Sequence, residues 1–247
     1  MLSVVCWKWS TPGYRSKFGP EAVNTLKSMV DRHYQDPHRF LCVTDDAVGI
    51  DPSVEIVKPW NDFVDLPSPH DFQASSKKNP SCYRRLRAYH PEIGATFGPR
   101  FVMIDLDCVI TGDLRPVWNR PEDFVSWGDT NPQKGSHYNG SLCLMTAGCR
   151  PQVWTEFDPK TSPAKALRAS CWGSDQGWIS YCLGPKEAKW GKADGVYSFR
   201  NHLQGQRQLP ANAKIIVFHG RQDPWSPESQ DIPWVREHYR TDQEVCK

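Results

Sequence analysis

Residues 101–114 read FVMIDLDCVITGDL: four apolar residues run into Asp105 and Asp107, and the apolar character then resumes. The apolar run predicts a buried strand over 101–105. Ligands of an open α/β sheet bind beyond the carboxyl ends of the strands, which is where these two aspartates would emerge. Alternation along the strand is expected to aim both carboxylates to one side, where a divalent cation would relieve their repulsion. The alternative is that they cap turns or pair with arginines.

The segments around this strand alternate between strand and helix patterns. A helix that begins at Pro20 keeps one apolar face at helical spacing. Strand followed by helix and then strand predicts an α/β fold with a parallel sheet and crossover helices. No repeat or linker is visible, so one domain is expected. Further strands are predicted at 2–7, 40–44, 54–57, 123–127, 141–145 and 215–219, and helices at 83–89, 150–157, 162–170 and 175–183.

The composition argues against several classes of protein. The chain has 247 residues, and its 30 Lys and Arg against 28 Asp and Glu give a net charge of +2, which indicates no nucleic-acid or membrane-surface role. Nine cysteines without a CxxC pair argue against a disulfide framework or a structural zinc site and favour a reducing compartment. The N-terminus lacks the basic region of a signal peptide, and no window approaches about 18 apolar residues. We therefore expect a cytoplasmic protein without a transmembrane segment.

Four further segments occur in a fixed order around and after the aspartate pair: RRLRAY at 84–89, HYNGSLCLM at 137–145, GSDQGWI at 173–179 and FHGRQDPW at 218–225. Together with the pair, they resemble the motifs of glycosyltransferase family 8, the family of glycogenin and the bacterial lipopolysaccharide galactosyltransferases. The resemblance implies a GT-A fold, in which a Rossmann-like, mixed but mostly parallel sheet is flanked by helices.

The resemblance also implies an activity and a division of the chain. The activity is transfer of a hexose from a nucleotide-sugar, above all a UDP-sugar, to a hydroxyl of a glycan, lipid or protein acceptor, with retention at the anomeric carbon. The chain is expected to form a single glycosyltransferase domain over 1–247. A nucleotide-binding half would cover about 1–110 and an acceptor and catalytic half about 111–230, with a C-terminal tail at 231–247.

The metal of such an enzyme would be held by Asp105, Asp107 and, as implied by the resemblance, His219. Two carboxylates and an imidazole suit Mn²⁺ at least as well as Mg²⁺ and leave room for two phosphate oxygens. A histidine at a strand end is by itself more often structural than a ligand. The GRQDPW segment that follows is what favours a ligand role for His219.

Three residues would carry the chemistry. Asp175 matches the carboxylate that the family places near the reacting carbon, and Asn139 matches the asparagine that contacts sugar hydroxyls. Arg85 stands where the family has a lysine that faces the donor sugar and phosphate, and a guanidinium can grip phosphate oxygens with two bonds. The alternatives are a helix N-cap at Ser174 or Asp175, and a solvated helix face that carries Arg85.

Other residues would bind the nucleotide. Lys8, Trp9 and Tyr14 follow the first strand, where the family binds the base and ribose. Asp129 is matched more loosely to a family acid, Gly220 would let the backbone approach the diphosphate, and Arg221 would supply positive charge. Positive charge is needed there because this chain has Asp223 where the family has a lysine, in a motif two residues shorter than that of glycogenin-like proteins.

Two other functions fit part of the pattern. DLDCVIT at 105–111 mimics the first motif of haloacid-dehalogenase-type phosphatases, where Asp105 would be the nucleophile and Asp107 the acid and base. That motif normally lies on the first strand, however, and the later acidic pair of those enzymes is missing from this sequence. The third possibility is a sugar-nucleotide-binding protein that has lost turnover, which the acid at position 223 suggests.

Overall fold

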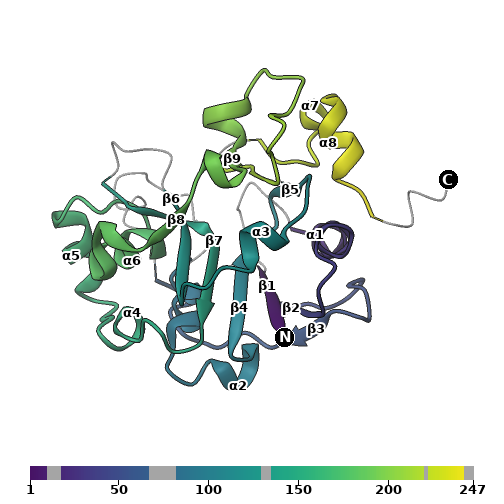
Figure 1. Ribbon diagram of the computed structural model, residues 1–247. Coiled ribbons are helices and arrows are strands. Elements are labelled where there is room, and N and C mark those ends of the chain that lie inside the picture. Colours follow the sequence, from purple (N-terminus) through teal and green to yellow (C-terminus); the bar gives the residue numbers. More distant parts are fainter. Residues whose placement is uncertain (10–17, 67–81, 129–134, 220–221, 242–247) are drawn as a thin grey trace.

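The computed structural model describes residues 1–9, 18–66, 82–128, 135–219 and 222–241. At its centre is a seven-stranded sheet in the order β3-β2-β1-β4-β7-β6-β8 (Figure 1). Within this sheet, β7 pairs antiparallel with β4 and β6, and the other neighbours pair in parallel, as the predicted mixed, mostly parallel sheet requires. The strands are β1 Leu2–Lys8, β2 His38–Thr44, β3 Glu55–Val57, β4 Arg100–Ile104, β6 Phe124–Gly128, β7 Tyr138–Thr146 and β8 Ala188–Trp190.

A second, three-stranded sheet lies beside the first. It has the order β5-β10-β9, with β5 Cys108–Ile110, β9 Val196–Ser198 and β10 Ile215–Val217. β10 pairs antiparallel with β5 and parallel with β9. The chain therefore leaves the large sheet at Ile104 and enters the small one at Cys108, so that the two aspartates lie in the connection between the sheets.

The helices are mostly short, and one of them shows how sequence decides local structure. α1 has Pro20 at its first turn, where a missing N–H costs nothing, and its apolar positions at helical spacing are buried. The helices are α1 Pro20–His33, α2 Gly94–Phe97, α3 Arg115–Trp118, α4 Gln152–Thr155, α5 Ser162–Arg168, α6 Asp175–Leu183, α7 Pro227–Gln230 and α8 Pro233–His238. Helices of other types are η2 Cys82–Tyr89, η4 Gly184–Lys186, η5 Lys192–Asp194 and η6 Phe199–Leu203.

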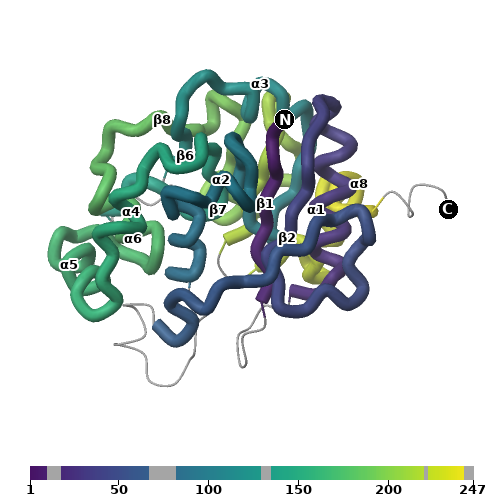
Figure 2. The backbone as a smooth tube through the Cα atoms, turned by 90° about the horizontal axis from the view of Figure 1, so that it is seen from below, coloured from purple at the N-terminus to yellow at the C-terminus, as the bar shows by residue number. Residues whose placement is uncertain are grey.

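Two hydrophobic cores cover the two faces of the large sheet. Successive strand residues point to opposite faces, so Val4 belongs to one core and Val5 to the other. The first core joins the sheet to α1, α8 and the small sheet, and the second joins it to η2, α4 and α6. In Figure 1, α1 lies to the right of the central strands and α4, α5 and α6 to the left. Figure 2 shows α8 beside α1, where Arg32 donates to the carbonyls of His238 and Arg240 (2.7 and 3.0 Å).

The predicted elements are present, with differences at their ends. The central strand stops at Ile104 instead of residue 105, and β7 begins three residues earlier than expected, at Tyr138. The helix expected at 150–157 is reduced to 152–155, and the one at 83–89 is a 3₁₀ helix. β5, β8 and β9 were not predicted, because three residues are too few to show a period.

Two further findings concern the whole described part of the chain. None of its helices has the length and apolar character needed to cross a membrane. The eight cysteines that lie in the described ranges are all free thiols.

Candidate functional site

The turn that carries the two aspartates is tied to both sheets. The backbone N–H of Asp105 donates to the carbonyl of Ser141 in β7 (2.9 Å), and the carbonyl of Asp107 accepts from the N–H of Phe218 after β10 (2.7 Å). The residues from 105 to 107 form a bend and not a strand, so strand alternation does not set the direction of the two carboxylates, and their shared orientation stays a prediction. The turn nevertheless lies at the carboxyl end of β4, as predicted.

Arg85 joins one of these aspartates to a distant part of the chain. Its Nη1 lies 2.5 Å from Oδ1 of Asp105, and its Nη2 lies 2.8 Å from Oδ2 of Asp175. Burial by itself lowers the pKa of the guanidinium, but the two carboxylates more than reverse this and hold that pKa well above its usual value. The structure thus contradicts the alternative of a solvated helix face, because only 13% of the Arg85 side chain is exposed.

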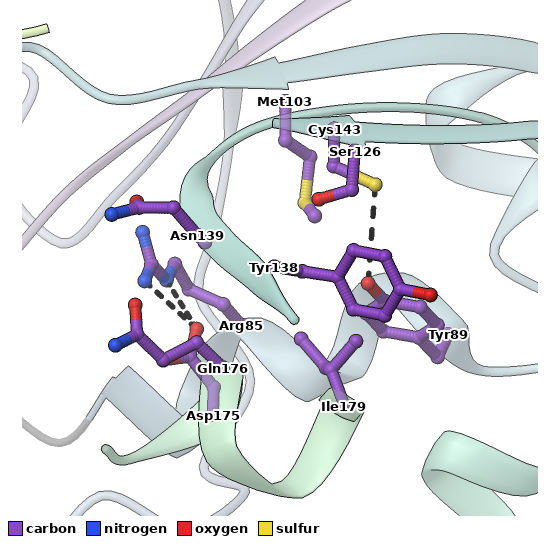
Figure 3. A pocket seen from close by; sticks show the side chains of 11 residues that line it. Arg85, Tyr89, Met103, Ser126, Tyr138, Asn139, Cys143, Asp175, Gln176 and Ile179 are labelled. Carbon is purple, nitrogen blue, oxygen red and sulfur yellow. Dashed lines mark hydrogen bonds and ion pairs between the residues drawn. The ribbon is translucent and has the colours of Figure 1, made fainter. Parts of the chain in front are cut away.

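Asp175 is the first residue of α6 and is 2% exposed. The hydroxyl of Ser174 donates to its Oδ1 (3.0 Å), and Nε of Arg85 donates to its Oδ2 (2.8 Å). Ser174, the N-cap residue, makes no capping bond with its side chain. The buried carboxylate of Asp175, at the start of α6, therefore faces the guanidinium of Arg85, as Figure 3 shows.

Strand β7 contributes Asn139 and Gly140 beside Arg85 and Asp175. Asn139 is buried, and its Oδ1 accepts from the backbone N–H of Ser141 (3.0 Å), which leaves the amide nitrogen as a donor. Gly140 follows, without a side chain to separate the strand from Arg85. A small pocket opens here; its lining residues are Arg85, Tyr89, Met103, Ser126, Tyr138, Asn139, Gly140, Cys143, Asp175, Gln176 and Ile179 (Figure 3).

His219 lies two residues after the end of β10. Its Nε2 is 2.6 Å from Oγ of Ser198 in β9, and its ring meets that of Trp127 edge-on, with 5.7 Å between centroids. The predicted donor set of Asp105, Asp107 and His219 has the right chemistry for Mn²⁺ or Mg²⁺. In the described ranges, however, no group of three or more His, Cys, Asp or Glu side chains converges closely enough to hold a metal ion. As arranged, these residues do not form a metal centre, and their ligand role stays a prediction.

The predicted nucleotide residues are described in part. Lys8, the last residue of β1, is 5% exposed; its Nζ donates to the carbonyl of Asp46 (2.7 Å) and lies 3.5 Å from the Asp46 carboxylate. Trp9 follows directly, and its ring lies 5.0 Å from the guanidinium carbon of Arg84. Tyr14, Asp129, Gly220 and Arg221 lie outside the described residues.

Sequence reasoning brought Arg85, Asp105, Asn139 and Asp175 to one edge of the sheet but missed a neighbour. Arg84 is 9% exposed and lies against Trp9, directly after β1. The only signal in the sequence was its place in the RRLRAY segment, where a run of arginines is typical of a solvated surface.

No family model matches the chain, and no curated protein matches it. Among solved structures, the galactosyltransferase LgtC in complex with donor and acceptor sugar analogs has a TM-score of 0.58 and 14% identity, over 99% of each chain. The glycosyltransferase GlyE of Streptococcus pneumoniae TIGR4 has a TM-score of 0.60 and 12% identity, over 99% of this chain and 62% of its own. The bifunctional glycosyltransferase WbbM reaches 0.51 at 13% identity, over 96% of this chain and 50% of its own. The chain therefore has the GT-A fold of glycosyltransferases.

Proposed function

We propose that this protein transfers a hexose from a nucleotide-sugar, with a UDP-sugar as the first candidate, to an acceptor hydroxyl, with retention at the anomeric carbon. The observation that supports this most is the buried guanidinium of Arg85 between Asp105 and Asp175, beside Asn139 and at the carboxyl edge of a glycosyltransferase fold. That edge is where open α/β sheets bind their ligands.

The charges of this cluster suit the reaction. One guanidinium and two carboxylates leave a net negative charge, and positive charge develops on the sugar ring as the bond to phosphate breaks. In a site as buried as that of Asp175, a fixed carboxylate stabilises such charge far better than in water. We assign this role to Asp175, and we assign to Arg85 the orientation of that carboxylate together with contact to the departing phosphate.

The remaining steps need no protein nucleophile. Asn139 donates from its amide nitrogen to a sugar hydroxyl and so fixes the ring, since its oxygen is held by Ser141. The departing phosphate takes the proton of the acceptor hydroxyl. No step of this proposal passes through a metal ion.

A screen of nucleoside diphosphates by thermal unfolding, followed by a donor-hydrolysis assay, tests the proposal. We expect at least one nucleotide to raise the unfolding temperature, and its sugar conjugate to be hydrolysed slowly without acceptor. Asp175→Asn should lower turnover by about a hundredfold, as removal of one transition-state contact does. The control is Asp113→Asn, because that carboxylate pairs with Arg115 on the surface.

The other functions predict different results. Release of phosphate from p-nitrophenyl phosphate with Mg²⁺ would favour a phosphatase, and nucleotide binding without hydrolysis or transfer would favour a binding protein. The metal prediction has its own test: Mn²⁺ should raise the unfolding temperature of the nucleotide-loaded protein, and Asp107→Ala should remove that increase.

A further inference from the structure

Arg84 is a buried cation that has no carboxylate partner among the described residues. It is 9% exposed, yet no carboxylate in the described ranges lies within ion-pair distance of it. Its one described hydrogen bond runs from Nη2 to the carbonyl of Trp60 (3.2 Å), whereas a guanidinium has five N–H groups to donate. Burial of a charge without an opposite charge nearby is costly, so an ion pair within the described residues does not explain this arginine.

The other two arginines of η2, Arg85 and Arg87, do have carboxylate partners. Arg85 reaches two carboxylates, and Arg87 reaches Asp62 at 3.4 Å. Burial lowers the pKa of the Arg84 guanidinium, and the more distant Asp45 and Asp62 only partly offset this. The pKa of Arg85, in contrast, is raised. Of these two adjacent buried arginines, Arg84 is the one whose positive charge the described residues leave uncompensated.

The position of Arg84 points to the missing partner. In the order β3-β2-β1-β4, the chain builds outward from β1 to β3 and then returns to place β4 on the other side of β1. The crevice between the carboxyl ends of β1 and β4 is therefore the switch point, where such sheets bind nucleotides. Arg84 stacks on Trp9, directly after β1, and Arg85 contacts Asp105, directly after β4. Two successive residues of one helix thus place guanidinium groups on both sides of this crevice.

We infer that Arg84 binds a phosphate group of the nucleotide donor, on the β1 side of the crevice. This inference rests on the proposed function, and it supplies a cation for the diphosphate in a chain that has Asp223 where its resemblance led us to expect a lysine. The Trp9 ring, 5.0 Å from the guanidinium carbon, restricts the movement of this group, and a guanidinium held in place suits two-bonded recognition of phosphate. Among the described residues only Nη2 has a hydrogen-bond partner, so Nε and Nη1 need give up no described partner to bind a phosphate.

The experiment compares Arg84→Met with wild type by calorimetry. The probes are uridine, UMP and UDP, or the corresponding series of another base if the nucleotide screen selects one. We expect Arg84→Met to weaken binding of the diphosphate roughly ten- to hundredfold, the range for a hydrogen bond between charged groups, and to leave binding of the nucleoside unchanged. Arg84→Lys keeps the positive charge but lacks the planar guanidinium, so its affinity for the diphosphate should lie between those of wild type and Arg84→Met.

A second measurement separates ligand binding from a structural role. Removing an uncompensated buried charge should leave the unfolding temperature of the ligand-free protein unchanged or higher. Arg87→Met is the matched control: it also removes a guanidinium stacked on tryptophans, Trp60 and Trp154, but one that has Asp62 as partner, and it should lower that temperature.

The outcomes are distinct. If wild type binds no nucleotide, the proposed function fails and the inference fails with it. If wild type binds and Arg84→Met binds the diphosphate equally well, the inference alone is overturned. Equal weakening for nucleoside and diphosphate would place Arg84 at the base and also reject the phosphate assignment, as would a loss of stability in the ligand-free Arg84→Met variant.

Discussion

Gly140 lies so close to Arg85 that a methyl group on its Cα would stand 2.8 Å from Nη2 of the guanidinium and 3.3 Å from Oδ2 of Asp175. Nη2 is the far end of a flexible side chain, but here two carboxylates hold it in place. The arginine can approach both carboxylates only because β7 has no side chain at this position. The absence of a side chain is thus part of the candidate site.

Gly140→Ala should therefore displace Arg85 from Asp175. We expect donor turnover to fall at least tenfold, with a loss of about 1–3 kcal/mol in the free energy of unfolding, as for other overpacked sites. Gly191→Ala is the control, because nothing lies within 4 Å of the added methyl there. Steady-state hydrolysis and chemical denaturation measure the two effects. Turnover equal to wild type would show that Arg85 need not stay where it is.

Removing Arg85 should be costly to the fold as well as to the site. Arg85→Ala leaves the carboxylate of Asp175 buried without its cation, and breaking a buried pair in this way costs about 3–5 kcal/mol. Arg115→Ala removes an arginine from the exposed pair with Asp113 and should have little effect on unfolding. Urea denaturation of both variants is the measurement, and equal stability of the two would contradict the importance of the buried pair.

The contact between α1 and α8 should make stability depend on pH. The rings of His33 and His238 lie 6.1 Å apart, and burial, together with nearby positive charge such as that of Arg32, lowers the pKa of both. The folded protein then binds fewer protons than the unfolded chain. Stability from this source is full above the unfolded value of about 6.5 and falls as the pH decreases below it. His238→Asn should flatten the decrease in unfolding temperature between about pH 7.5 and 5.5.

His38 should act in the opposite direction. Its hydrogen bond to Asp31 (3.2 Å) raises its pKa above the ordinary value, although burial acts against this. Its contribution to stability is present below the unfolded pKa and is lost as the pH rises through the folded one. His38→Asn should therefore reduce stability more at low pH than at high pH. A parallel loss at all pH values would show that the imidazole does not titrate as described.

The aromatic packing behind His219 should matter for stability. Phe218 is fully buried and stacks on Phe199, with ring centroids 4.2 Å apart, and the ring of Trp234 from α8 lies at 6.2 Å. Phe218→Ala should lower the free energy of unfolding by about 3–5 kcal/mol. Val48→Ala, at an exposed position, is the control. A small loss for Phe218→Ala would mean that the surrounding rings collapse into the space.

The sequence predicted the parts of this molecule that follow a long period or a specific motif. α1 and the apolar strands of the large sheet are of this kind, and so is the start of α6 at Asp175, which the structure places where it was expected. The strand β9 was not predicted, because three residues are too few to show a period, whereas β10 lies in the longer apolar run at 215–219. The sequence pattern also cannot show that Arg85 has two carboxylate partners and that Arg84 has none among the described residues. That difference depends on the direction in which each successive residue of a 3₁₀ helix points.

The link between β5 and β10 has a consequence for how the protein is made. β5 ends at Ile110, and its partner β10 begins at Ile215, so the turn of Asp105 and Asp107 stays unsupported on this side until about a hundred further residues have left the ribosome. Contacts so far apart in sequence form late. A truncated translation product that stopped before residue 215 would contain every strand of the large sheet. It would still lack β10 and the hydrogen bond from Phe218 that supports this turn.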